Sequence, residues 1–347
     1  MKDLLGMNLE EFKAELAKYN LPSFRAKQLF RNIHKNGVAD FGEMTDLSKD
    51  LRSSLSENYY ITKCEPLKRK KSGNTIKQLL SYPDGETVET VLMMYSDRKD
   101  QKERNTLCVS TQVGCAMGCA FCATGMSQFA RNLTAGEIIA QIWATNHSLK
   151  PNHVTNIVLM GMGEPLANYD EVIKAIKLMN DPEGLNIGIR RITLSTSGLV
   201  PQLKKLAKED LGIVLAISLH APNDALRSEL MPINRTYPLE DLMSAVDEYI
   251  KKTGKRVTFE YILLKDINDH PAHARELATL VRGKMININL IPYNTISDAD
   301  FKRTPYEKVL AFRKILTEKG IDAIIREEMG GEIEAACGQL RRRNMHN

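Results

Sequence analysis

The sequence has few aromatic residues, little net charge and no long apolar run. Phe, Trp and Tyr make up 6% of its 347 residues, and one of these is a tryptophan. The longest nearly apolar stretch, 211–219, is about half of the roughly 20 residues that cross a bilayer, so we expect no membrane span. Hydrophobic residues at 43% and charged residues at 26% exclude a collagen-like or wholly disordered chain and favour a folded one.

Cysteine is also scarce, and its distribution is uneven. Three of the six cysteines lie within 115–122, so a disulfide scaffold is excluded and metal binding or catalysis is favoured. The first residues lack the apolar core and cleavage site of an export signal, which predicts a cytoplasmic protein.

The charge is mildly basic and concentrated near the ends of the chain. The formal net charge is +5, and residues 1–75 carry 14 Lys and Arg against 10 Asp and Glu. Basic runs occupy 68–71 and 341–343. These features suggest an anionic partner such as nucleic acid, with ordinary solvated faces as the alternative.

Three kinds of pattern follow one another along the chain. Apolar residues at helical spacing over 1–59 predict a small helical module, in which one helix begins at Pro22-Ser23 and ends near Gly37. Alternating runs around Pro83-Asp84-Gly85 predict a hairpin within 60–100 that joins two domains, followed by a charged linker at 96–104. The main domain is expected at 101–331, and 332–347 is a separate C-terminal segment.

The main domain alternates strand-like and helix-like runs. Strands are predicted at 106–110, 155–160, 191–195, 213–219, 257–263 and 286–291, with helices at 134–145, 171–179, 201–208, 239–251, 270–281 and 305–319. Six such units with nearly continuous apolar strands predict an α/β fold, a partial (βα)6 barrel similar to a TIM barrel. In such a fold the chemistry gathers where the strands end.

The spacing Cys115-x-x-x-Cys119-x-x-Cys122 follows the first predicted strand. Three thiols with Gly114 and Gly118 beside them suit an iron-sulfur cluster. A four-iron cluster held by three thiolates leaves one iron free to bind a small molecule. Structural zinc is the alternative, but it usually needs four protein ligands; three ordinary buried cysteines are the other.

This spacing, with Phe121 before the last cysteine, resembles the signature of the radical S-adenosylmethionine (SAM) superfamily. The segments 105–115, 161–166, 335–340 and 23–29 together resemble the RlmN-type RNA methyltransferases. That resemblance implies methylation of carbon 2 of adenosine in 23S rRNA and in tRNAs, with one 4Fe-4S cluster per chain and two SAM molecules per turnover.

The resemblance also implies roles for single residues. Cys337 becomes an S-methylcysteine intermediate, Cys108 forms a transient disulfide with it, and Glu89 accepts the ring proton. The cluster ligands are Cys115, Cys119 and Cys122. The implied SAM contacts are Gly163, Glu164, Ser195, Ser218, Leu219, His220 and Asn294.

The partners implied are 23S rRNA and tRNA, docked by the helical module and its basic neighbours, and an electron donor such as flavodoxin or ferredoxin. A monomer without membrane contact is expected. A Cfr-like enzyme that methylates carbon 8 is one alternative, although Pro165 and the double alanine before Cys337 resemble the RlmN branch. A non-catalytic RNA-binding protein with an iron-sulfur or zinc centre is the other.

Overall fold

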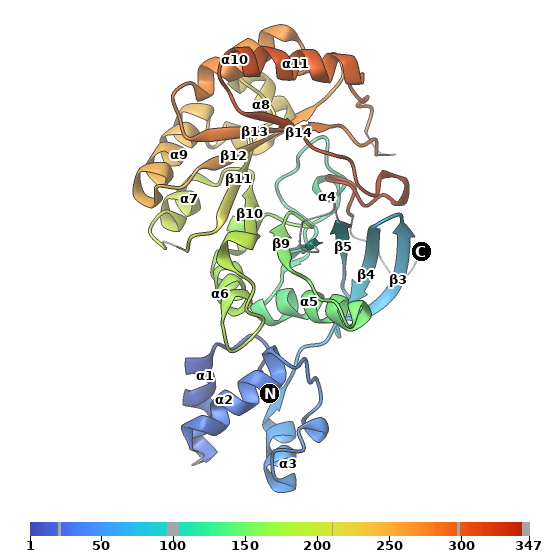
Figure 1. The fold of residues 1–347 in the computed structure, drawn as a ribbon, viewed down its shortest axis with the longest axis vertical. Coiled ribbons are helices and arrows are strands. Elements are labelled where there is room, and N and C mark those ends of the chain that lie inside the picture. Colours follow the sequence, from blue (N-terminus) through green and yellow to red (C-terminus); the bar gives the residue numbers. More distant parts are fainter. Residues whose placement is uncertain (20–21, 96–103, 210, 297–298, 342–347) are drawn as a thin grey trace.

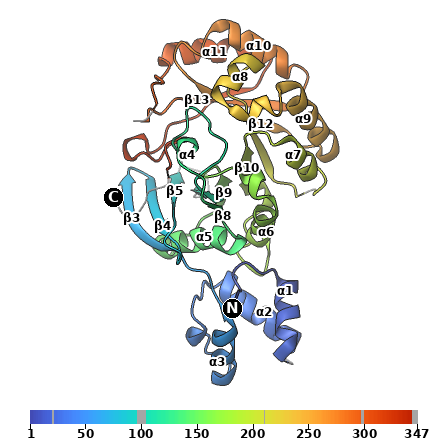
Figure 2. The same ribbon diagram turned by 180° about the vertical axis from the view of Figure 1, so that it is seen from behind.

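A curved sheet of ten strands forms the centre of the protein, and helices lie around its outside (Figures 1 and 2). The computed structural model describes residues 1–19, 22–95, 104–209, 211–296 and 299–341. The strand order is β14-β13-β12-β11-β10-β9-β6-β5-β4-β3. The charged linker expected at 96–104 lies outside the described residues except for Arg104.

The six predicted strand–helix units are confirmed, and with them the α/β partial barrel. The strands are β6 (Arg104–Cys108), β9 (Asn156–Leu159), β10 (Ile192–Thr196), β11 (Val214–Ser218), β12 (Val257–Leu263) and β13 (Ile286–Pro292), each parallel to the next. The helices are α5 (Ala135–Leu149), α6 (Tyr169–Asn180), α7 (Val200–Leu206), α9 (Leu239–Thr253), α10 (Pro271–Val281) and α11 (Tyr306–Glu318). The shorter α8 (Asp224–Leu230) follows β11, and β14 (Ala323–Ile325) is a further parallel strand too short to give a sequence pattern.

The segment predicted as a two-stranded hairpin contains three strands. These are β3 (Glu65–Ser72), β4 (Thr75–Ser81) and β5 (Thr87–Tyr95), and the turn between β4 and β5 is the predicted one. They continue the barrel sheet, because β5 pairs antiparallel with β6. The basic run 68–71 hid β3 from the sequence pattern; lysines are common on a strand at the edge of a sheet, where they discourage pairing with another chain.

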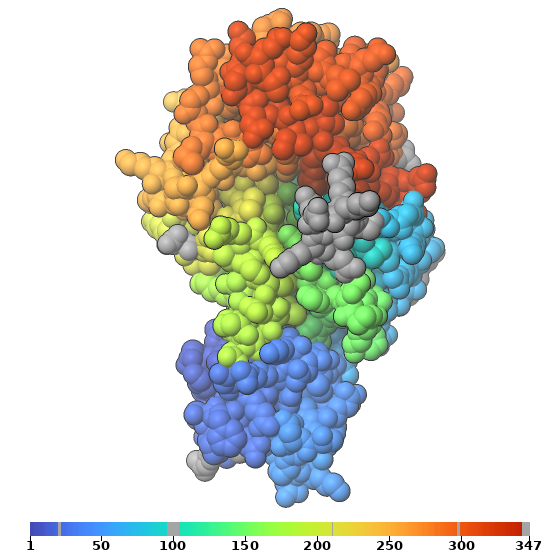
Figure 3. Space-filling model, viewed as in Figure 1, coloured from blue at the N-terminus to red at the C-terminus, as the bar shows by residue number. Residues whose placement is uncertain are grey.

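The helical module at the N-terminus comprises α1 (Leu9–Leu16), α2 (Ser23–His34) and α3 (Lys49–Asn58). It forms a lobe at one end of the molecule (Figure 3). Asn8 begins α1 through a capping box with Glu11, in which each side chain bonds the other residue's backbone N–H. The short strands β1 (Lys2–Asp3) and β2 (Tyr59–Tyr60) pair in parallel and close the module.

The module and the barrel share one continuous apolar core. At the junction, Lys27 and Arg31 of α2 form ion pairs with Glu183, which follows α6. No helix in the described parts of the chain combines the length and apolar character that a membrane span requires.

The first prediction concerns His34, which is fully buried in the module with its ring 4.2 Å from that of Phe30. Burial lowers the pKa of His34 to about 3, whereas the unfolded chain has a value near ~6.5. The folded module therefore binds fewer protons, and its free energy of unfolding should fall by about 1.4 kcal/mol per pH unit below roughly pH 6.5. Above that pH the full stability is present.

Hydrogen exchange of α1 and α2, corrected for intrinsic rates, measures this slope between about pH 7 and about pH 5, which covers the upper part of the window between the unfolded and folded pKa values. His34→Phe should remove most of it. An equal slope in the variant would show that other groups control the module's stability.

Candidate active site

The three clustered cysteines lie on one loop that follows the first barrel strand. The loop runs from β7 (Gln112–Val113) to α4 (Ala123–Met126). Gly114 and Gly118 have φ angles of +76° and +64°, which side chains other than glycine rarely adopt. A Cβ atom at Gly114 would also lie 2.1 Å from the carbonyl oxygen of Gln128. The glycines therefore shape the loop, as the sequence predicts.

Cys115, Cys119 and Cys122 line a single cavity, called here the three-cysteine cavity. Burial raises the pKa of each thiol, that of Cys115 to about 12. The bare thiols are therefore protonated at neutral pH, and a metal centre that binds them must displace their protons.

The donor set fits an iron-sulfur cluster. Among the described residues, no three His, Cys, Asp or Glu side chains are grouped for a single metal ion. A four-iron cluster gives each thiolate its own iron atom, so its ligands need not converge on one point. Three thiols around one shared cavity match this requirement.

The cavities also contain buried polar atoms that no described residue hydrogen-bonds. They are the hydroxyl of Ser197 and Oε2 of Glu260, whose residues line the three-cysteine cavity, and Oδ1 of Asn294, which lines a second cavity described below. Of these atoms, Glu260 Oε2 has a charged neighbour, the guanidinium of Arg326 at 3.7 Å. Because buried polar atoms normally have partners, their position favours a polar ligand at this place.

Glu164 lies in the loop after β9 (Asn156–Leu159) and joins this loop to the residue that follows β10. Its Oε1 accepts the N–H of Leu166 at 3.0 Å, and its Oε2 accepts the N–H of Ser197 at 2.7 Å. Burial raises the pKa of this carboxyl group. Gly163 before it has a φ of +100°, and a Cβ atom there would approach Gln112 to 2.5 Å.

Arg227 of α8 holds the ends of β10 and β11. It is 1% exposed, and its guanidinium donates to the carbonyl oxygens of Ser197 at 2.7 Å, Leu219 at 3.2 Å and Ser218 at 3.3 Å. Burial lowers the pKa of Arg227 to about 10, so it stays charged at neutral pH. Ser195 and Ser218, two of the predicted SAM contacts, line the three-cysteine cavity on these strands.

His220 lies two residues after β11 and has a φ of +60°. Its Nδ1 accepts the backbone N–H of Ile262 at 3.0 Å. Burial, and to a smaller extent Arg227, lowers the pKa of His220 to about 3. The neutral ring therefore carries its proton on Nε2 and offers one N–H donor in the three-cysteine cavity.

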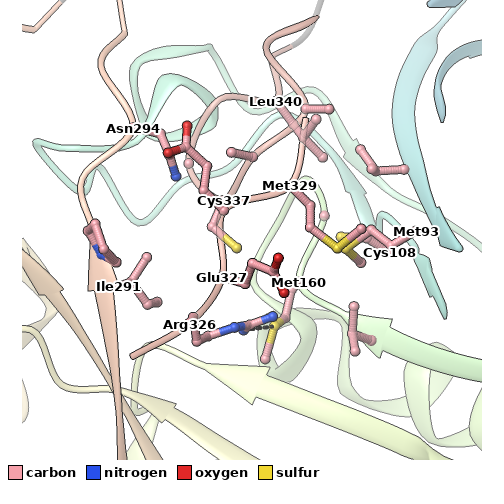
Figure 4. A pocket seen from close by; sticks show the side chains of 18 of the residues that line it. Met93, Cys108, Met160, Ile291, Asn294, Arg326, Glu327, Met329, Cys337 and Leu340 are labelled. Atoms are coloured by element: carbon pink, nitrogen blue, oxygen red, sulfur yellow. Dashed lines mark hydrogen bonds between the residues drawn. The ribbon is translucent and has the colours of Figure 1, made fainter. Parts of the chain in front are cut away.

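A second cavity, called here the Cys108 cavity, adjoins the first. Its walls include Cys108, Asn294 and three methionine side chains, Met93, Met160 and Met329 (Figure 4). Cys337 is exposed and lines both cavities, whereas Cys108 is buried and lines one. Burial raises the pKa of Cys108 to about 12. All six cysteines are described, and all are free thiols.

Two of the predicted site residues do not line either cavity. Neither Glu89 nor Leu219 is among the described residues that line the two cavities. Leu219 is fully buried, and its backbone N–H donates to the carbonyl oxygen of Glu260. Glu89 is 1% exposed and lies beside the Cys108 cavity, on the same face of β5 as Val91, which lines it.

Comparison with known proteins agrees with this geometry. Residues 109–278 match the model of the radical SAM superfamily, and residues 2–61 match that of the ribosomal RNA large subunit methyltransferase N-terminal domain. A probable dual-specificity RNA methyltransferase RlmN from Symbiobacterium thermophilum is 48% identical over 98% of this chain and 91% of its own length. The chain belongs to the RlmN family.

Two other similar proteins also match nearly the whole chain. An RlmN homologue from Carboxydothermus hydrogenoformans is 48% identical over 98% of each chain. The crystal structure of a radical SAM methyltransferase from Sphaerobacter thermophilus superposes with a TM-score of 0.93 at 46% identity, covering 98% of this chain and 99% of the other. Membership of the radical SAM superfamily implies a 4Fe-4S cluster and SAM as cofactors.

Two charged residues of this RlmN-family site were missed in the sequence. Glu260 lies in the middle of the apolar strand β12, and a charged residue in such a strand is a sequence signal that could have identified it. Arg326 follows the unpredicted strand β14 and lines both cavities. Its guanidinium lies 3.7 Å from Glu260, and the charge of Cys337, followed by that of Glu260, raises its pKa.

The second prediction tests the iron ligands of this RlmN-family protein. After anaerobic reconstitution, the wild type should bind roughly four irons per chain. Each single serine variant of a cluster ligand should lose most of that iron, because only two thiolates would then remain to hold the cluster. These variants are Cys115→Ser, Cys119→Ser and Cys122→Ser. Cys64→Ser is the matched control and should keep it. Unchanged iron in Cys119→Ser, or zinc in the wild type, would contradict the assignment.

Proposed function

We propose that this protein is a radical SAM methyltransferase that methylates carbon 2 of an adenosine in 23S rRNA and in tRNAs. One observation carries the proposal: the exposed Cys337 lies in a wall common to the three-cysteine cavity and the Cys108 cavity. A thiol in that place can receive a methyl group on one side and deliver it on the other. The names of the RlmN relatives support the same conclusion.

Cys115, Cys119 and Cys122 would hold one cluster and leave its fourth iron for SAM. A reduced cluster with SAM bound supplies the 5′-deoxyadenosyl radical. We assign the SAM contacts to Gly163, Glu164, Ser195, Ser218, His220 and Asn294, with Leu219 restricted to a backbone role. Glu164 has free lone pairs for an ammonium group, and the orphaned oxygen of Asn294 can accept a hydrogen bond.

Cys337 would take the methyl group of a first SAM as a thiolate nucleophile. The guanidinium-bearing Arg326 lines the same two cavities as Cys337. Cys108 is unsuited to this step, because its thiol is buried and its pKa is raised to about 12. Exposure therefore distinguishes the two thiols before any substrate binds.

The substrate adenine would enter the Cys108 cavity. Methionine sulfurs make favourable contacts with aromatic rings and adapt to their shape. After a second SAM is cleaved and one hydrogen is removed from the S-methyl group of Cys337, its carbon adds to carbon 2 of the ring. Two SAM molecules are consumed per methyl group transferred.

Glu89 would then accept the proton that leaves carbon 2. Cys108 would attack the sulfur of Cys337, forming a disulfide as the carbon–sulfur bond breaks. The methylene carbon would take up one proton to become the product methyl group, and the unpaired electron of the adduct would pass to the oxidised cluster. Because this disulfide must be reduced in every turnover, we place the protein in the reducing cytoplasm. A flavodoxin or ferredoxin would supply electrons to the cluster.

The helical module and the basic strand β3 would dock the RNA. Phosphate contacts supply affinity there, while a flipped adenine supplies specificity. We expect a monomer, since both cavities are built from a single chain.

The third prediction separates the two thiols. Cys337→Ala should abolish RNA methylation, because the methyl acceptor is lost. Cys108→Ala should accumulate RNA covalently attached to the protein, because the carbon–sulfur bond to Cys337 is not broken. Gel electrophoresis after nuclease digestion, with peptide mass spectrometry, detects the adduct. Cys64→Ala serves as the control and should methylate at the wild-type rate.

Release of methylated RNA at the normal rate by Cys108→Ala would contradict its role. The product from the wild type, compared with standards, should be 2-methyladenosine. The 8-methyl isomer alone would favour the Cfr-like alternative, and an absence of 5′-deoxyadenosine would favour a non-catalytic RNA-binding protein.

A further inference from the structure

Lys77 of β4 is a lysine that neither the sequence pattern nor the proposed chemistry uses, yet it is only 4% exposed. Its Nζ lies 2.9 Å from Oε2 of Glu89 and donates to the carbonyl oxygen of Glu334 at 2.7 Å. A buried ammonium group is costly unless it is paired and hydrogen-bonded, and both conditions are met here.

The same carboxylate oxygen also holds the chain beyond Cys337. Oε2 of Glu89 accepts the backbone N–H of Arg341 at 3.0 Å. Lys77 thus fixes residue 334 and Glu89 fixes residue 341, on either side of Cys337. We call residues 334–341 the Cys337 segment.

The positively charged side chains near Glu89 outnumber the negatively charged ones. Lys68 and Lys70 of β3 line the same small hollow as Lys77 and Glu89. On the C-terminal side, the side chain of Arg341 is paired with that of Glu334 at 2.9 Å. The negative charge of Glu89 is therefore what attracts both Lys77 and the N–H of Arg341 to this place.

We propose that Lys77 is a positioning residue that, with Glu89, holds the Cys337 segment in the wall between the two cavities and releases it when Glu89 takes up a proton. The release rests on the proposed function, in which the proton from carbon 2 moves to the Glu89 carboxylate. That transfer removes the negative charge of Glu89, and it weakens the contacts of Glu89 with the ammonium group of Lys77 and with the backbone N–H of Arg341. The freed segment can then bring Cys337 onto Cys108 at the step when the disulfide must form.

Hydrogen exchange in the cluster-containing protein without RNA tests the holding role directly. In the peptide covering 335–341, Lys77→Met and Glu89→Gln should each exchange roughly tenfold faster or more, since a charge-assisted hydrogen bond is lost. Lys77→Arg keeps the charge and should recover much of the protection. Lys71→Met is the matched control, because Lys71 is exposed on the neighbouring edge strand β3, and it should exchange as the wild type does.

RNA methylation gives a second readout that a general loss of stability would not reproduce. Lys77→Met should lower kcat with little change in the KM for SAM, because Lys77 is not among the described residues of the three-cysteine cavity. Lys77→Arg should restore kcat in part. Wild-type exchange in both Lys77→Met and Glu89→Gln, or an unchanged kcat in Lys77→Met, would overturn the proposal.

Two further outcomes remain decisive. If Lys77→Met does not fold, the exchange of Glu89→Gln alone decides, and a wild-type rate there overturns the holding role. If Glu89→Gln exchanges faster but methylates RNA at the full rate, Glu89 is not the proton acceptor. The release step then fails with the proposed function, whereas the holding role of Lys77 is supported.

Discussion

The placement of Cys337 depends on hydrogen bonds that tie its segment to three separate parts of the barrel. The carbonyl oxygen of Gly338 accepts the N–H of Ala123, directly after the cysteine loop, at 2.8 Å. The side chain of Gln339 donates to the carbonyl oxygen of Thr295, beyond β13, at 3.1 Å. The contacts of Lys77 and Glu89 supply the third attachment. A short segment without regular structure can hold a reactive thiol in place because it is fixed at several points.

The residues that follow the barrel strands form the other part of the site, in addition to the segment that carries Cys337. Buried charged groups, above all Arg227 and Glu164, use their hydrogen bonds to fix backbone atoms of neighbouring strands. Such groups are costly to bury, and here they hold the cavity wall in one shape before any cofactor binds. Ser197 and Asn294, which line the cavities, each carry a buried oxygen without a hydrogen-bond partner among the described residues, and a ligand can supply that partner.

Much of the architecture could be predicted because the strands of a parallel barrel are continuous apolar runs. The three cysteines and the glycines beside them were equally visible as a local pattern. The sequence pattern failed in three places. β3 is basic because it is an edge strand, β14 has only three residues, and Arg326 reaches both cavities because β14 pairs with β13, a contact that the sequence pattern does not reveal. The ion pair of Lys77 with Glu89 joins the neighbouring strands β4 and β5, and the hydrogen bond from Lys77 to Glu334 spans most of the chain.

The central claim is that the transferred carbon passes through Cys337 and loses one hydrogen there. Incubation with SAM whose methyl group is fully deuterated, followed by mass spectrometry of the modified adenosine, tests it most directly. The account predicts a product methyl group that keeps two deuterium atoms, with the third found in 5′-deoxyadenosine. A product methyl group with all three deuterium atoms would show direct transfer from SAM and would contradict it.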